Sequence, residues 1–115
     1  MTIERIDPGT RLSETVAYGN LVFLAGHVAG DPDAGVYEQT RDILAQIDAH
    51  LAAAGTDRSR LLSVSIWLAD IATFDELNRA WDEWVDRANL PARATVEARL
   101  ASPAYKVEIA GVAAR

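Results

Sequence analysis

The sequence predicts an α+β fold in which two helices cover one face of a mixed β-sheet, a two-layer sandwich. Three observations support this prediction. The 115 residues fit one domain, residues 1–115, with little room for a second. Two segments repeat apolar residues every three or four positions, as amphipathic helices do. The segments around them alternate or stay apolar, as strands do, and the predicted order is β-β-β-α-β-α-β-β.

Three strands are predicted before the first helix. A short one precedes residues 7–9, whose Asp-Pro-Gly sequence is a turn signal. Residues 16–18 and 21–25 are predicted to form a hairpin through Gly19 and Asn20, because both residues tolerate positive φ. Residues 21–25 are apolar throughout, which predicts a strand covered on both faces.

The first helix is predicted from Val36 to Leu51. It follows a loop at residues 26–35 that is rich in Gly, Asp and Pro. Gly55 stands after the last periodic residue, where a left-handed C-cap is expected. Residues 62–68 then alternate polar and apolar side chains, which predicts a strand with one wetter face.

The second helix is predicted from Phe74 to Val85, with its apolar stripe turned to the core. Thr73 and Glu76 have the spacing of a capping box at its start. Pro91 marks its exit.

The last two strands are predicted at residues 92–100 and 105–113, with a turn near Ser102. Alternation along the first of them places Arg93 and Thr95 on one face. The sheet face away from the helices carries many apolar or small residues. Such a face usually packs against another chain, which predicts a homo-oligomer.

Composition narrows the classes of function. The net charge of −6 disfavours a nucleic-acid partner, and the absence of cysteine excludes disulfides, thiolate catalysis and Cys-based metal sites. The N-terminus lacks the pattern of a signal peptide, and no apolar run approaches the roughly 20 residues of a membrane span. We therefore expect a cytoplasmic protein without a membrane partner.

The histidines do not predict a metal site. His27 follows a strand end and is expected to have a structural role. His50 lies in the first predicted helix and is expected at the surface. With no cysteine and two histidines far apart in the sequence, a catalytic zinc site is not expected, and no metal ligand is predicted.

Two charged residues stand in positions suited to a binding cleft. Arg93 opens a strand directly after a Leu-Pro-Ala segment, and a guanidinium can meet a carboxylate through two parallel hydrogen bonds. Glu108 lies between Val107 and Ile109, where a carboxylate either forms a structural ion pair or activates a water. From the residues alone, structural and functional roles remain open for both.

The motifs around these two residues resemble the RidA/YjgF family. The resemblance is carried by Leu-Pro-Ala-Arg-Ala-Thr-Val-Glu at residues 90–97 and Lys-Val-Glu-Ile at residues 106–109. Asn78 and the Ala-Gly pair at residues 25–26 also fall where that family carries similar residues. The likeness covers nearly the whole chain and looks closest to the YoaB-like branch.

The resemblance implies a chorismate-mutase-like fold in a homotrimer with ligand clefts between subunits. Family members hydrolyse reactive 2-imino acids, such as 2-iminopropanoate and 2-iminobutanoate, to 2-oxo acids and ammonia, which prevents metabolite damage. The resemblance implies no metal and no organic cofactor. Arg93 would hold the substrate carboxylate and Glu108 would position the attacking water. Gly26 would offer a backbone contact, Thr95 would line the cleft and Asn78 would lie near it.

Three positions depart from the family pattern. Leu12 stands where many members have a Tyr at the cleft entrance, Thr95 stands for a Cys, and Ala25 stands for a Ser. These departures leave open a second hypothesis, a non-catalytic trimeric binder of small carboxylates. A third, RNA binding or cleavage, is disfavoured by the acidic charge.

The spacing of the two charges is a further constraint. If the last two strands formed a simple hairpin turning near Ser102, Arg93 and Glu108 would lie on the order of 10 Å apart. They can share one cleft only through strand twist, a different register or contributions from two subunits.

Overall fold

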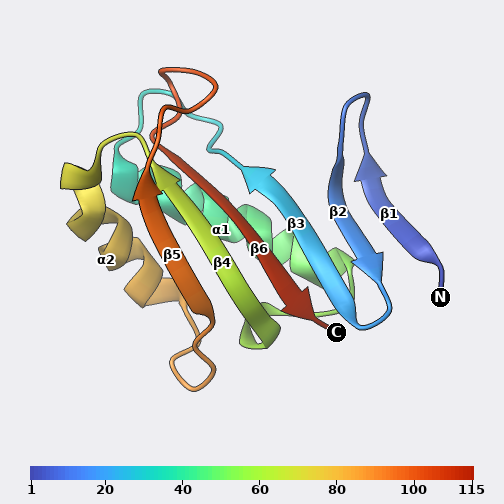
Figure 1. The fold of residues 1–115 in the computed structure, drawn as a ribbon. Helices are drawn as coiled ribbons and strands as arrows, with labels where there is room; N and C mark the ends of the chain where they lie inside the picture. The colour runs from blue at the N-terminus through green and yellow to red at the C-terminus, as the bar shows by residue number, and fades with distance from the viewer.

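The computed structural model describes residues 1–115 and has a single six-stranded sheet with two helices on one face (Figure 1). The predicted order of elements and the two-layer architecture are confirmed. The strands are β1 (Ile3–Pro8), β2 (Ser13–Tyr18), β3 (Leu21–His27), β4 (Leu61–Leu68), β5 (Ala92–Glu97) and β6 (Val107–Ala114), and the helices are α1 (Val36–Ala53) and α2 (Phe74–Trp84).

The strands are arranged in the order β1-β2-β3-β6-β4-β5, so the last strand of the chain lies in the middle of the sheet (Figure 1). β4 and β5 run parallel, and every other neighbouring pair is antiparallel. β5 and β6 therefore do not form a hairpin, because β4 lies between them. Trp67 of β4 is the link: it pairs with Val96 on one side and with Glu108 on the other.

The hydrophobic core lies between the sheet and the two helices. Alternate residues of β3, β4 and β6 face the helices, and the apolar stripe predicted for α1 is buried against them. Each fully buried Leu or Ile contributes about 1.5–3 kcal/mol relative to an exposed position. The larger hydrophobic residues that are fully buried are Val22, Ile43, Leu44, Leu51, Ile66, Leu68, Leu77, Val107 and Ile109.

Two glycines have the positive φ angles that their predicted turns require. Gly19, at φ 59°, makes the hairpin between β2 and β3, where Tyr18 pairs with Leu21. Gly55, at φ 81°, follows α1, and the next N–H, that of Thr56, donates back to the Leu51 carbonyl at 3.0 Å. That bond satisfies a carbonyl that the helix end would otherwise leave without a partner.

The capping box predicted for α2 is wrong. A 3-10 turn, Ile71–Thr73, runs directly into the helix, and Thr73, at φ −90° and ψ 13°, lacks the extended backbone typical of an N-cap residue. Its hydroxyl donates to the Asp70 carbonyl at 2.6 Å and does not cap α2. The Asp70 carboxylate instead accepts from the Ala72 N–H, at the start of the 3-10 turn. The cap has moved one turn ahead of its predicted place.

The sheet face opposite the helices is uncovered in this chain and apolar. Tyr18, Leu21, Phe23 and Val96 are 39–50% exposed although all four are large hydrophobic residues. The β3 segment predicted to be covered on both faces is thus covered on one face only. Neither helix is long and apolar enough to cross a membrane.

Candidate functional site

Arg93 projects from β5 toward α2, on the helix side of the sheet. Its register partner Val64 is buried against the helices, and its guanidinium carbon lies 5.2 Å from the centre of the Trp81 ring. The centre of the Phe74 ring lies 5.8 Å from the same carbon. Aromatic rings at these distances attract a cation through their π-faces and shield it from water.

The guanidinium of Arg93 has no hydrogen-bond or ion-pair partner in the chain, unlike those of Arg58 and Arg115. Burial lowers the pKa of Arg93, and the charge of Asp82 opposes that shift. An arginine nevertheless stays protonated at neutral pH. A partly buried cation with free donors is the arrangement that a planar carboxylate ligand would satisfy.

Asn78 and Thr95 belong to the same side of the sheet as Arg93. Asn78 lies four residues after Phe74 and three before Trp81, so it shares the helix face that meets the guanidinium. Thr95 follows Arg93 by two residues in β5, and its hydroxyl is buried without a partner. A buried hydroxyl without a partner is uncommon in folded proteins, so it is available to a ligand.

Glu108 and Gly26 meet on the opposite face of the sheet. In β6 the neighbours Val107 and Ile109 are buried on the helix side, which turns Glu108 to the open side. Gly26 lies in the irregular part of the β3–β6 register. A Cβ at Gly26 would overlap the Glu108 carboxylate and lie 3.1 Å from its Cδ, so only glycine allows the two to touch.

Leu12 lies in the turn between β1 and β2, where the Gly9 N–H donates to its carbonyl at 2.7 Å. Its side chain is 56% exposed. Those two strands form one edge of the sheet and β5 forms the other, so Leu12 does not approach Arg93 within a chain.

The predicted site residues therefore form two separate groups. We call Asn78, Arg93 and Thr95 the arginine group and Gly26 and Glu108 the glutamate group. The two groups face opposite sides of the sheet and are separated by β4. The chain has two surface hollows, one lined mainly by residues 97–103 and the other lying between α1 and α2, and neither contains a member of either group. One chain does not assemble the predicted cleft.

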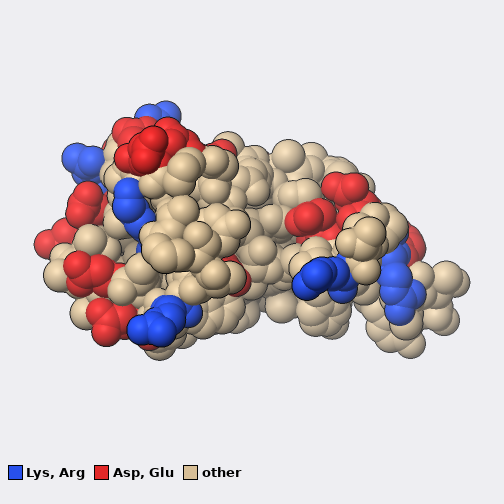
Figure 2. Space-filling model, turned by 90° about the horizontal axis from the view of Figure 1, so that it is seen from above, with Lys and Arg blue, Asp and Glu red and all other residues tan.

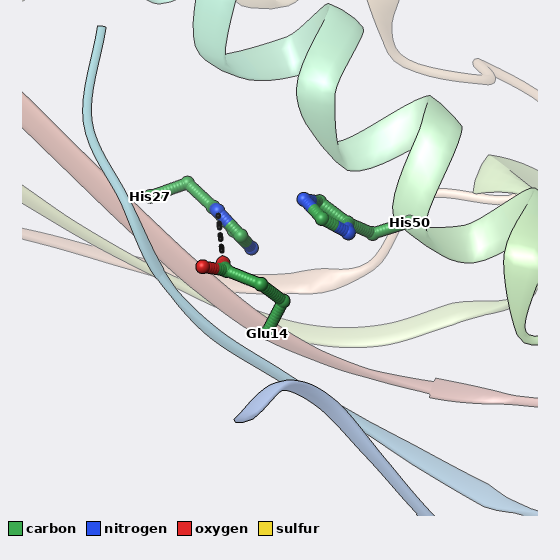
Figure 3. Close-up of side chains that lie close together, drawn as sticks. All are labelled: Glu14, His27 and His50. Carbon is green, nitrogen blue, oxygen red and sulfur yellow. Dashed lines mark ion pairs between the residues drawn. The ribbon is translucent and has the colours of Figure 1, made fainter. Parts of the chain in front are cut away.

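The structure also joins three polar residues that sequence reasoning kept apart. His27 is 4% exposed, and its ring stacks on that of His50 with centroids 4.5 Å apart and planes inclined by 18° (Figure 3). Its Nδ1 lies 3.5 Å from a carboxylate oxygen of Glu14. The two histidines were expected to lie apart, and the structure instead brings their rings into contact. The spacing in α1 could have predicted the position of His50. It follows the buried Ile47 by three residues and so falls on the inner edge of the helix.

Comparison with known proteins identifies the class. An uncharacterised Pseudomonas aeruginosa protein superimposes with a TM-score of 0.96 at 41% identity, covering 99% of both chains. A YjgF family member from Neisseria meningitidis has a TM-score of 0.94 at 43% identity, covering all of this chain and 96% of its own. Fold and motifs thus define an α+β protein of the YjgF type.

The sequence comparisons give the family. The family model described as Endoribonuclease L-PSP matches residues 2–115. The RutC family protein YoaB of Escherichia coli is 46% identical over 114 residues, which is 99% of each chain. A RutC family protein of Haemophilus ducreyi is 47% identical over 112 residues, 97% of this chain and 96% of its own. The chain belongs to this family, the RidA/YjgF family that its motifs resemble.

Proposed function

We propose that the protein hydrolyses reactive 2-imino acids to 2-oxo acids and ammonia, in clefts formed between copies of the chain. The observation that supports this most directly is the free, partly buried guanidinium of Arg93. The substrate carboxylate would take the bidentate position that no protein group occupies. Family membership supports the same reaction, for which 2-iminopropanoate and 2-iminobutanoate are the expected substrates.

The proposed reaction depends mainly on a water molecule held next to the imine carbon, and does not need a strongly activated nucleophile. The Glu108 carboxylate would accept a proton from water as the water oxygen attacks C2, and the C=N electron pair would move to nitrogen. That proton would pass to the nitrogen, which leaves an amine and a hydroxyl group on C2. Glu108 would then transfer the hydroxyl proton to the amine, the oxygen electron pair would form the C=O bond of the 2-oxo acid, and ammonia would leave with the electron pair of the C–N bond. An imine carbon is already electrophilic, so holding water and substrate together accounts for much of the acceleration.

Assembly of the cleft would require at least two chains. The arginine group and the glutamate group cannot face one ligand within a chain, because the sheet lies between them. The exposed apolar sheet face, which includes Phe23 and Val96, is the kind of surface that a neighbouring copy would cover. We propose a homotrimer in which the glutamate group of one subunit faces the arginine group of the next.

The surface charges suit a small ligand better than a nucleic acid. The chain carries a net charge of −6, and the Lys and Arg side chains on the face drawn in Figure 2 are dispersed among Asp and Glu side chains. A polyanion needs a continuous basic surface. A small carboxylate needs only the local positive charge of Arg93.

The second candidate function is a trimeric binder that captures small carboxylates without efficient turnover. It is favoured by the exposed Leu12 and by Thr95, which replace the Tyr and Cys of many relatives. Both changes leave the arginine in place, so binding would persist while the rate changed.

The test is to generate 2-iminopropanoate with an amino-acid oxidase and follow 2-oxo acid and ammonia with and without the purified protein. Faster hydrolysis with the protein is expected. Equal rates across several imino acids, together with saturable binding of a 2-oxo acid, would instead establish the binder.

Gly26→Ala is expected to lower imine hydrolysis by about tenfold or more, because the new methyl group displaces the carboxylate that positions the water. The measurement is kcat/KM for 2-iminopropanoate. Gly30→Ala is the matched control, since a Cβ there would come no closer than 4.0 Å to the Asp42 carboxylate. Equal activity of the two variants would show that the contact between Gly26 and Glu108 has no part in the reaction.

A further inference from the structure

Three side chains with metal-binding atoms converge from three elements on the helix side of the sheet. Glu14 comes from β2, His27 from the end of β3 and His50 from α1 (Figure 3). One ligand atom of each lies within 4.8 Å of the other two. None of the three side chains donates or accepts a hydrogen bond within the chain, and Nε2 of His27 is buried without a partner.

A simple ion pair does not account for the cluster. The 3.5 Å from the Nδ1 of His27 to the nearest carboxylate oxygen of Glu14 is longer than a normal hydrogen bond. The other ring nitrogen, Nε2, is buried and has no partner either. An imidazole whose two ring nitrogens both lack a hydrogen-bond partner can offer its lone pair to a metal ion.

We infer that Glu14, His27 and His50 bind one divalent transition-metal ion per chain, and that Zn²⁺ is the ion that suits them best. Two imidazoles and one carboxylate are a donor set that zinc uses with a fourth position left for water or another ligand. Imidazole donors favour zinc and its neighbours over Mg²⁺ and Ca²⁺, which prefer oxygen.

A small rearrangement would complete the coordination. Ligand atoms in a tetrahedral zinc shell lie about 3.3 Å apart, so the three atoms must close by no more than about 1.5 Å. His27 is fixed by burial, whereas His50 and Glu14 are partly exposed and free to turn. The stacked ring of His50 would rotate so that its lone pair points to the same centre as that of His27.

The surroundings favour a cation. His50 lies in the last turn of α1, where the unsatisfied carbonyls give the helix its negative end. The ion would join β2, β3 and α1, so we expect it to stabilise the fold. Arg93 and Glu108 are not part of the cluster, so the inference stands apart from the proposed hydrolysis.

The test is a titration of chelator-treated protein with Zn²⁺ by calorimetry and with Co²⁺ by visible absorption. We expect one ion per chain, Co²⁺ bands of a four- or five-coordinate centre, and a higher unfolding temperature with Zn²⁺. His50→Ala and Glu14→Gln should each weaken binding at least tenfold and abolish the Co²⁺ bands.

Glu38→Gln is the control, because Glu38 is an exposed carboxylate in the first turn of α1. It should leave affinity and spectrum unchanged. Circular dichroism of His50→Ala checks that the fold is kept, which we expect because the replaced ring makes no hydrogen bond. No saturable binding below about 1 mM Zn²⁺, or unchanged binding in the folded His50→Ala protein, would overturn the inference.

Discussion

Replacing Arg93 by alanine is expected to lower kcat/KM for 2-iminopropanoate by about 10²- to 10⁴-fold. Two charge-assisted hydrogen bonds to the substrate carboxylate contribute about 3–6 kcal/mol together, and each 1.4 kcal/mol is a factor of ten. The measurement is 2-oxo acid formation at several concentrations of enzymatically generated imine. Arg93→Lys should recover part of the loss, since an ammonium keeps the charge but not the planar fork.

The stability of the same variant distinguishes a binding role from a structural one. Arg93 makes no hydrogen bond or ion pair, and its burial is unfavourable, so alanine should leave the unfolding temperature unchanged or raise it. Arg99→Ala is the control, because Arg99 is an exposed arginine six residues further along. A lower unfolding temperature with undiminished hydrolysis would assign Arg93 to the fold instead of the ligand.

The parts of the fold that depend on neighbouring residues could be predicted from the sequence. Gly19 marks the hairpin and Gly55 the end of α1 because both positions require positive φ. The spacing of apolar residues located α1 and α2 to within a few residues. The capping box failed because the 3-10 turn before α2 depends on Asp70, outside the motif.

The order of the strands could not be predicted in the same way. The placement of β6 between β3 and β4 is set by packing across the whole sheet, and no local pattern in the sequence reports it. That placement decides the geometry of the candidate site, since it puts β4 between Arg93 and Glu108. The contact of His27 with His50 is likewise long-range, as 23 positions separate the two histidines in the sequence.

The separation of the two groups would matter for the proposed hydrolysis, because it keeps the two charges apart. A carboxylate-binding arginine and a water-positioning glutamate on one surface of one chain would attract each other and close into an ion pair. On opposite faces they remain free, and Arg93 keeps its unpaired donors in the single chain. Assembly would then create the complete site by bringing unlike faces of two chains together.

Mixing two inactive variants is therefore expected to restore activity. If Arg93→Ala and Glu108→Gln chains are unfolded together at equal amounts and refolded, about one quarter of the clefts should be intact in a closed ring. An intact cleft takes Arg93 from a Glu108→Gln chain and Glu108 from a neighbouring Arg93→Ala chain. At equal amounts each of these two positions holds the required chain in about half of the clefts, so both do in about one quarter. The measurement is imine hydrolysis by the mixture, compared with each variant refolded alone.

A second mixture supplies the control. Arg93→Ala and Asn78→Ala both alter the arginine group, so every cleft in that mixture carries one defect, and the mixture should be no more active than the mean of the two variants refolded alone. Size-exclusion chromatography with light scattering would verify that both mixtures form the same oligomer. Restoration in neither mixture, with the oligomer intact, would mean that each cleft draws both groups from one chain. Since β4 and the plane of the sheet separate those groups within a chain, that result would require a rearrangement of β5 on assembly.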